Sequence, residues 1–196
     1  MKKVNNIIIF IISLLSVCFF IKDINLGHND RLLSDVSIIF VLLIPKIIRK
    51  ITKLNITPML ELIYLVFMFL AHFVGSIVNL YNTTWWYDLF AHFLSGILTC
   101  ILSLIILKWL NMYNNKNKLF NVIFIIAFAL MIASLWEFCE FAADKFGGLN
   151  VQHNVETGVL DTMEDMLICF LGSIIVSIKY IFEKSKGLIN KIVSLC

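Results

Sequence analysis

One stretch of the sequence places an acid and a histidine inside an apolar run. Within residues 85–96, Asp88, His92 and Gly96 recur at every fourth position, and the residues between them are mostly aromatic or aliphatic. At about 100° per residue, this spacing puts all three on one narrow face of a helix. An ionisable group at membrane depth costs about 3 kcal/mol or more. The pair therefore predicts a partner, water or a ligand close by.

Carboxylates also enter two later apolar runs. Glu137 and Glu140 lie three residues apart in the last turns of one run, where the helix dipole disfavours anions. Asp161 and Asp165 share one face at the start of the next run, and Asp165 lies a full turn inside it. These acids need neutralising groups as well, so the sequence predicts one shared polar site.

The composition excludes a soluble domain. The chain has 196 residues, is 60% hydrophobic and only 15% charged, and its mean hydropathy is +0.93. One core of this length cannot bury so much apolar surface. We therefore predict a polytopic all-α membrane bundle in a single domain, 1–196. Its six transmembrane helices are expected at about 4–21, 33–48, 59–80, 88–107, 119–141 and 161–182.

The distribution of charge predicts the orientation of these spans. If the loops alternate between the two sides, 13 of the 16 Lys and Arg residues fall on one side. By the positive-inside rule that side is the cytoplasm, and both termini lie there. Of the 13 acids, 11 fall on the outer side together with all four histidines. The expected depths bring seven of them together near the outer face: His72, Asp88, His92, Glu137, Glu140, Asp161 and Asp165.

Imidazoles and carboxylates at one depth predict a divalent-metal site. Histidine nitrogen with carboxylate oxygen suits Zn, Mn or Fe, and an all-oxygen subset suits Mg. The expected roles are metal ligation by Asp88, His92, Glu137, Glu140 and Asp165, catalysis by Glu137 and Glu140, and substrate binding by His72 and Asp161. His72 also fits an interhelical hydrogen bond. Asp161, at a helix start, equally fits an N-cap.

Other site chemistries have no support in the sequence. The five cysteines are odd in number and widely spaced, which indicates neither a disulfide framework nor a zinc cluster. No basic patch with interleaved aromatic residues points to nucleic acid. A nucleophile elbow, a phosphate loop and an H-E-x-x-H motif are all missing. The partner expected from the sequence is the lipid bilayer, and neither the substrate nor the oligomeric state follows from it.

The order of these motifs resembles a known family. Tyr87-Asp88-x3-His92, then Glu137-x2-Glu140, then Asp161-Thr162-x2-Asp165 are similar to the YjdF-like family of bacterial inner-membrane proteins. More distantly, they resemble the VanZ-like proteins associated with teicoplanin tolerance. The chain differs from similar sequences at Met163, where Gln is usual. The resemblance implies a multi-pass protein of the bacterial cell membrane and supplies no established reaction.

Three functions fit these observations. The first is an outward-facing metal pocket that performs metal-assisted hydrolysis or transfer on a lipid or envelope precursor. The second is a cation- or proton-coupled transporter, and the third is a structural or accessory membrane protein. Whether the protein is an enzyme at all stays open at this stage. The long connection 142–160 carries Gly147, Gly148 and His153, and it is long enough to be a lid over the site.

Overall fold

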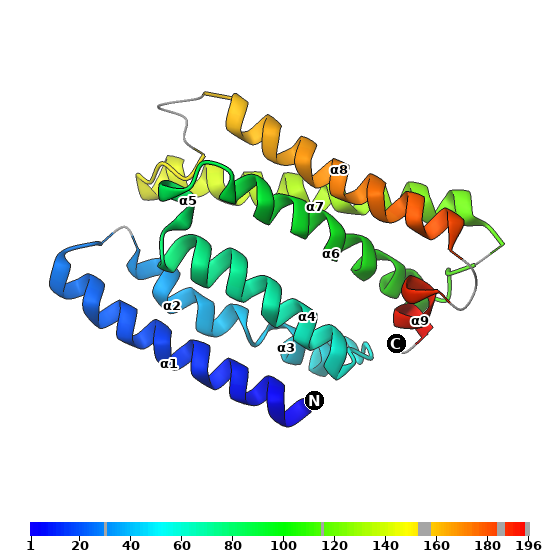
Figure 1. Ribbon diagram of the computed structural model, residues 1–196, viewed down its shortest axis with the longest axis horizontal. Coiled ribbons are helices and arrows are strands. Elements are labelled where there is room, and N and C mark those ends of the chain that lie inside the picture. The colour runs from blue at the N-terminus through cyan, green and yellow to red at the C-terminus, as the bar shows by residue number, and fades with distance from the viewer. Residues whose placement is uncertain (30, 115, 153–157, 184–186, 195–196) are drawn as a thin grey trace. The chain divides into compact units, whose positions relative to one another are not determined.

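The protein is built from helices arranged in two compact units (Figure 1). The computed structural model describes residues 1–29, 31–114, 116–152, 158–183 and 187–194. Every regular element within these ranges is a helix, which confirms the predicted all-α class. The first unit is Met1–Ala91 and the second is His92–Cys196. The single domain over 1–196 stays a prediction.

The described helices confirm a membrane bundle. Five spans are long and apolar enough to cross a bilayer, and one further apolar helix, α2 (Leu32–Val41), is shorter. The prediction of six spans with both termini in the cytoplasm remains a prediction. The five spans are α1 (Lys2–Leu26), α4 (Pro58–Met68) continued by η1 (Phe69–Ile77), α6 (Tyr87–Trp109), α7 (Lys118–Gly147) and α8 (Leu160–Phe182).

The run expected as the second span, 33–48, is interrupted. Helix α2 ends at Val41, and α3 (Ile44–Thr52) begins after a two-residue turn. Pro45 stands in the first turn of α3, where the missing N–H costs no helical hydrogen bond, whereas a helix continuous over 33–48 would lose one there. At the other end of α3, Arg49 Nη2 donates to Glu61 Oε2 over 3.3 Å. Glu61 is therefore paired and buried at the start of α4.

The third span changes helix type in its middle. It begins as predicted, with the Thr57 hydroxyl accepting from Leu60 N at 3.4 Å and Pro58 in the first turn. From Phe69 onward the chain forms the π-helix η1. A single α-helix over 59–80 is thus not what forms. The short helix α5 (Leu80–Thr83) follows.

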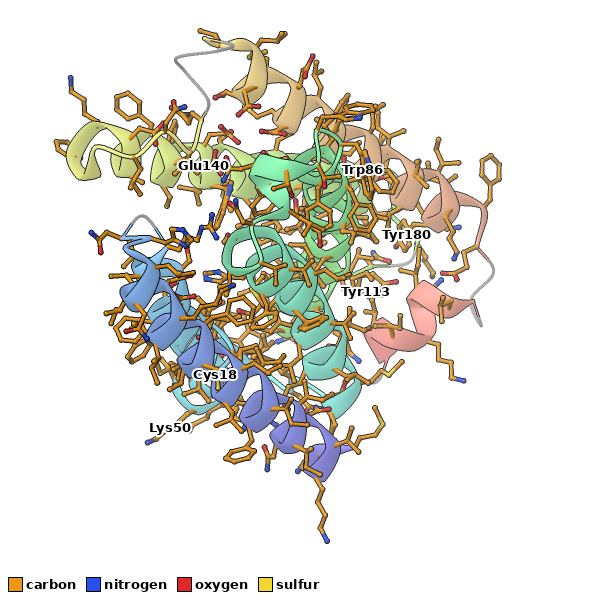
Figure 2. All side chains as sticks on the ribbon, turned by 60° about the vertical axis from the view of Figure 1, so that its left-hand side comes forward. Cys18, Lys50, Trp86, Tyr113, Glu140 and Tyr180 are labelled. Carbon is orange, nitrogen blue, oxygen red and sulfur yellow. The ribbon has the colours of Figure 1, made fainter. Side chains whose placement is uncertain are left out.

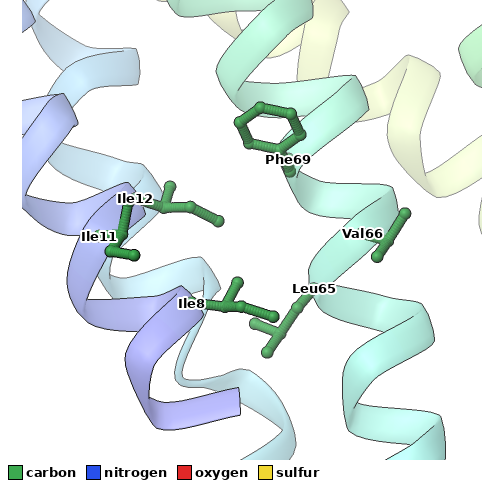
Figure 3. A pocket seen from close by; sticks show the side chains of 6 residues that line it. All are labelled: Ile8, Ile11, Ile12, Leu65, Val66 and Phe69. Atoms are coloured by element: carbon green, nitrogen blue, oxygen red, sulfur yellow. The ribbon is translucent and has the colours of Figure 1, made fainter. Parts of the chain in front are cut away.

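The first unit contains an apolar hollow. It has a volume of about 210 Å³ and lies between α1 and the α4–η1 span (Figure 3). No polar group lines it, so it offers no chemistry and fits a surface that faces lipid. Its six lining residues are Ile8, Ile11, Ile12, Leu65, Val66 and Phe69.

In the second unit, α7 packs along α8. The buried face of α7 recurs every four residues and combines small, apolar and polar side chains with a carboxyl group near one end. It consists of Asn121, Ile125, Ala129, Ala133 and Glu137. At one end, Asn121 Nδ2 donates to the Tyr180 hydroxyl at 2.7 Å, and Tyr180 in turn contacts Tyr113 (Figure 2). Near that end, α9 (Leu188–Ser194) packs through Ile189 and Val193.

Candidate functional site

Two glycines bring α6 and α8 into backbone contact. A Cβ atom at Gly96 would lie 2.2 Å from the carbonyl oxygen of Cys169. One at Gly172 would lie 2.6 Å from the carbonyl oxygen of Phe93. Both glycines therefore allow the two helices to pack closely. Backbone atoms cannot turn aside from such a contact as a side chain can. The crossing therefore determines which residues of α6 and α8 face each other one to two turns closer to the start of each helix.

Asp88, His92 and Asp165 form a group at that point. Each offers one ligand atom, and these atoms all lie within 4.8 Å of one another. His92 Nε2 lies 3.7 Å from Asp165 Oδ2. The boundary between the units falls inside α6, between Ala91 and His92, so Asp88 is placed by the helix that it shares with His92. The helical face predicted from residues 85–96 is therefore the face that carries the group.

The group is shielded from solvent. The exposed fraction is 6% for His92 and 1% for Asp165, and Asp88 is half-buried. Donor atoms around a tetrahedral ion lie about 3.4 Å apart when each bond is about 2.1 Å. A small inward movement of these side chains would thus close the group around a metal. Two carboxylates and one imidazole also carry the charge that suits a divalent cation.

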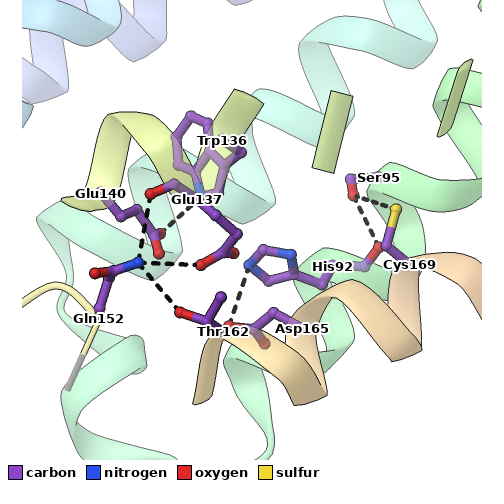
Figure 4. Close-up of polar contacts among 9 residues, drawn as sticks. All are labelled: His92, Ser95, Trp136, Glu137, Glu140, Gln152, Thr162, Asp165 and Cys169. Carbon is purple, nitrogen blue, oxygen red and sulfur yellow. Dashed lines mark hydrogen bonds and ion pairs between the residues drawn. The ribbon is translucent and has the colours of Figure 1, made fainter. Parts of the chain in front are cut away.

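Helix α7 adds two acids beside this group. Glu137 and Glu140 are both buried, and in Figure 4 the Glu137 carboxylate and the His92 ring point toward one another. Glu140 Oε1 accepts from Trp136 Nε1 at 2.7 Å. The sequence predicts that both acids lie in the last turns of their helix, and this is wrong. Helix α7 runs on to Gly147, so the helix dipole does not act on them at close range.

Gln152 reaches the same acids from the loop after α7. Its Nε2 donates toward the Thr162 hydroxyl at 3.1 Å and lies 3.5 Å from Glu137 Oε2 and 3.4 Å from the Glu137 carbonyl oxygen. Glu137 Oε1, by contrast, is buried and has no hydrogen-bond partner within the described ranges. One oxygen of Glu137 is thus held in place, and the other remains available to a ligand or to water.

Gln152 was not expected from the sequence. At the position where similar sequences carry Gln, Met163 is largely exposed and does not contribute an amide to the site. The signal that could have indicated Gln152 is the turn chemistry before it. Gly148 adopts a left-handed conformation with φ of 66°, which ends α7 and reverses the chain.

Asp144 holds this loop against the helix. Its two carboxylate oxygens accept from Val151 N at 2.6 Å and Gln152 N at 3.0 Å. Asp144 thus connects the loop to α7 through two hydrogen bonds. Residues 148–152, the described part of the predicted lid beyond α7, therefore form an arm that these hydrogen bonds hold against the helix. His153 and residues 154–157 lie outside the described residues, so the lid as a whole stays a prediction.

Replacing Asp144 by Ala should loosen this arm. Hydrogen bonds to a charged acceptor contribute about 1.5–3 kcal/mol, so we expect roughly tenfold or faster amide exchange at Val151 and Gln152. Hydrogen–deuterium exchange with peptide-level mass spectrometry measures this rate. Lys145→Ala, at the exposed neighbouring position, is the matched control and should leave exchange unchanged. Equal protection in wild type and Asp144→Ala would show that the two hydrogen bonds do not hold the loop.

The two residues predicted to bind substrate lie in different surroundings. Asp161 is in the first turn of α8, one turn before Asp165, but the N-cap residue is Val159 and no side chain caps this helix. The N-cap alternative for Asp161 is therefore not what forms. His72 belongs to the first unit, where its Nε2 lies 3.0 Å from the Ser34 carbonyl oxygen and 3.2 Å from the Ser37 hydroxyl. That is the interhelical hydrogen bond, made to α2.

Comparison with known proteins identifies the family. The model of the family described as predicted membrane protein (DUF2238) matches residues 7–185, and the chain belongs to this family. An uncharacterized protein of Thermotoga maritima is 28% identical over 149 residues, which cover 73% of this chain and 72% of the relative. No solved structure matches. The family match spans every residue of the site described above.

Proposed function

We propose that this member of the DUF2238 membrane protein family binds a divalent metal ion through Asp88, His92 and Asp165. The observation that carries the proposal is the distance: three ligand atoms of the types that metals prefer lie within 4.8 Å of one another. Their burial supports it further. Buried acids side by side repel one another unless a cation or a proton neutralises them.

The ligand types narrow the choice of ion. One imidazole with two carboxylates matches the sites that hold Zn, Mn or Fe, whereas Mg prefers oxygen ligands alone and would use His92 poorly. Three protein ligands leave at least one coordination position for another molecule, which is the arrangement of catalytic rather than structural sites. Glu140, which the sequence also predicts as a ligand, would contribute a further carboxylate from α7.

Glu137 is the residue best placed for proton transfer. Its Oε1 is buried without a hydrogen-bond partner in the described part of the chain, while Gln152 holds the other side of the carboxylate. A carboxylate in this position can accept the proton of an attacking water molecule as a general base. A divalent cation in the neighbouring site would act as a Lewis acid on a substrate carbonyl or phosphoryl oxygen. We therefore propose metal-assisted hydrolysis or transfer.

The proposed substrate is a lipid or a lipid-linked envelope precursor. The site lies at one end of three apolar spans, near the helix starts of α6 and α8, where a bilayer presents lipid headgroups. Asp161, one turn before Asp165, would contact that substrate, and His72 stays a prediction in that role. The family match supports the YjdF-like resemblance. We also propose that the chain is a multi-pass protein of a bacterial cell membrane and that the site opens to the outer face.

Elemental analysis tests the metal site. Detergent-purified wild type is incubated with Zn²⁺ or Mn²⁺, desalted and compared with a His92→Ala/Asp165→Ala variant of equal helical content. We expect about one metal ion per chain in the wild type and a large loss in the variant. Equal metal content in both proteins, or no retained metal in either, contradicts the proposal.

Glu137→Gln separates binding from catalysis. The substitution keeps the size of the side chain but removes its ability to accept a proton. We expect metal content to be unchanged and hydrolysis to fall by about 100-fold or more. The assay follows release of inorganic phosphate or fatty acid from bacterial envelope lipid extracts. A Glu137→Gln protein with wild-type hydrolysis would remove Glu137 from the mechanism and leave the metal site standing.

A further inference from the structure

A second pair of buried acids lies on α1 and α2 of the first unit. Asp23 stands in the last turn of α1 and Asp35 in the first turn of α2, the two helices that pack side by side as a hairpin (Figure 1). Each side chain is only 1% exposed. The negative charge of Asp23 acts on Asp35, so the two carboxyl groups are electrostatically coupled.

The hydrogen bonding of Asp35 is incomplete for an ionised carboxylate. Both of its side-chain oxygens are buried and neither has a hydrogen-bond partner within the described ranges, and the same holds for Asp23 Oδ2. Only Asp23 Oδ1 is contacted, by His28 Nδ1 at 3.2 Å. The hydroxyl of Ser16 donates to the backbone carbonyl of Asp35 and not to its carboxyl group.

The surrounding charges do not compensate the pair fully. Arg31, at the N-terminus of α2, acts on Asp35 with a favourable charge. His28 is partly exposed, and Lys22 lies over the Phe19 ring at 5.0 Å. From η1, His72 is engaged by Ser34 and Ser37 of α2. Two negative charges would therefore face one arginine in a desolvated place, where an ionised carboxylate without hydrogen bonds is costly.

Neutralisation by a divalent metal fits this pair poorly. Among the described residues, the one group of three ligand atoms within 4.8 Å is that of Asp88, His92 and Asp165. Asp23, Asp35 and the histidine between them in sequence do not meet that distance. The remaining way to remove one charge from coupled, buried carboxyl groups is to add one proton to the pair.

We propose that Asp23 and Asp35 form a proton-binding site, in which the pair takes up one proton, on Asp35, in mildly acidic solution. The location of the proton follows from the contacts within the described residues, because Asp23 has a donor at one oxygen and Asp35 has none. The pair belongs to α1 and α2, whereas the proposed metal ligands belong to α6 and α8. Its ligand is a proton, so it does not depend on the metal proposal.

Infrared difference spectroscopy tests the site directly. A protonated carboxylic acid has a C=O stretching band separate from that of carboxylates, and this band shifts in D₂O. We expect the band in the wild type in mildly acidic solution and the loss of its Asp35 component in Asp35→Asn, whose side chain imitates the protonated acid and preserves the fold. Glu164→Gln, at an exposed position, is the control and should leave the band unchanged.

Asp23→Asn supplies a second measurement. Without the neighbouring negative charge, Asp35 should release its proton at lower pH, so the band should disappear at lower pH than in the wild type. Absence of the band in the wild type in mildly acidic solution overturns the proposal. An undiminished band in Asp35→Asn overturns it as well. Neither result bears on metal retention, which is measured separately.

Discussion

We expect the replacement of Asp165 by Asn to lower the affinity of the proposed metal site for Zn²⁺ or Mn²⁺ by about 100-fold or more. Loss of a group that only orients a ligand already costs 10- to 100-fold in comparable sites, so loss of a direct ligand costs at least as much. Asp165 is 1% exposed, and His92 Nε2 lies 3.7 Å from its carboxylate. The amide of Asn keeps the size of the side chain and removes the charge. Competition titration against a metal indicator measures the change.

A matched control is available next to this residue. Glu164 precedes Asp165 on α8 but is exposed, so Glu164→Gln removes the same charge without touching the group. It should bind metal as the wild type does. If Asp165→Asn and Glu164→Gln bind metal equally well, the three-residue group is not the metal site.

Replacing Gly96 by Ala destabilises the protein by about 3 kcal/mol. The added methyl group would lie 2.2 Å from the carbonyl oxygen of Cys169, and a backbone atom cannot turn aside as a flexible side chain can. Helices α6 and α8 must therefore separate, which also weakens the opposite contact at Gly172. Because this crossing aligns His92 with Asp165, metal retention should fall together with stability. Thermal unfolding in detergent, followed by size-exclusion chromatography, measures the first effect.

Gly147→Ala is the control for this substitution. It places the same methyl group at the end of α7, where the nearest atom, Leu149 Cγ, is 3.6 Å away at an ordinary contact distance. Alanine is the better helix former, so stability should stay the same or rise slightly. A Gly96→Ala protein as stable as Gly147→Ala would contradict the close approach of α6 and α8.

The helical face that carries the site was predictable from spacing alone. Asp88, His92 and Gly96 recur at every fourth residue, and a regular α-helix places such residues on one side. The same rule placed Asp161 and Asp165 on one face of α8, and the structure shows that Asp165 lies near His92. Periodicity works here because α6 is uninterrupted and the polar residues have to avoid lipid.

Periodicity failed where the helix itself changes. The run 59–80 contains no proline or charged residue after Glu61 that would mark a change, yet the chain becomes a π-helix at Phe69. Such turns shift every later side chain around the axis. His72 consequently could be assigned a hydrogen-bonding role or a site role from the sequence, and only the coordinates place it against Ser34 and Ser37.

Contacts made by loops were the least predictable. Gln152 reaches Glu137 because Gly148 reverses the chain and Asp144 binds two backbone amides beyond it. Each step is ordinary turn chemistry, but nothing in the sequence states where the side chain at the end of the turn points. The end of α7 was misplaced for a related reason. Residues 142–147 are polar enough to suggest a loop and nevertheless continue the helix.

The central claim is that His92 binds a metal ion together with Asp88 and Asp165. The most direct test is pulsed electron paramagnetic resonance of the Mn²⁺-loaded protein, which detects the nuclear spin of a coordinated nitrogen. We predict a nitrogen coupling of the imidazole type in the wild type and its loss in His92→Gln, while His72→Gln keeps it. A bound Mn²⁺ without nitrogen coupling in the wild type, or with the same coupling in His92→Gln, would contradict the claim.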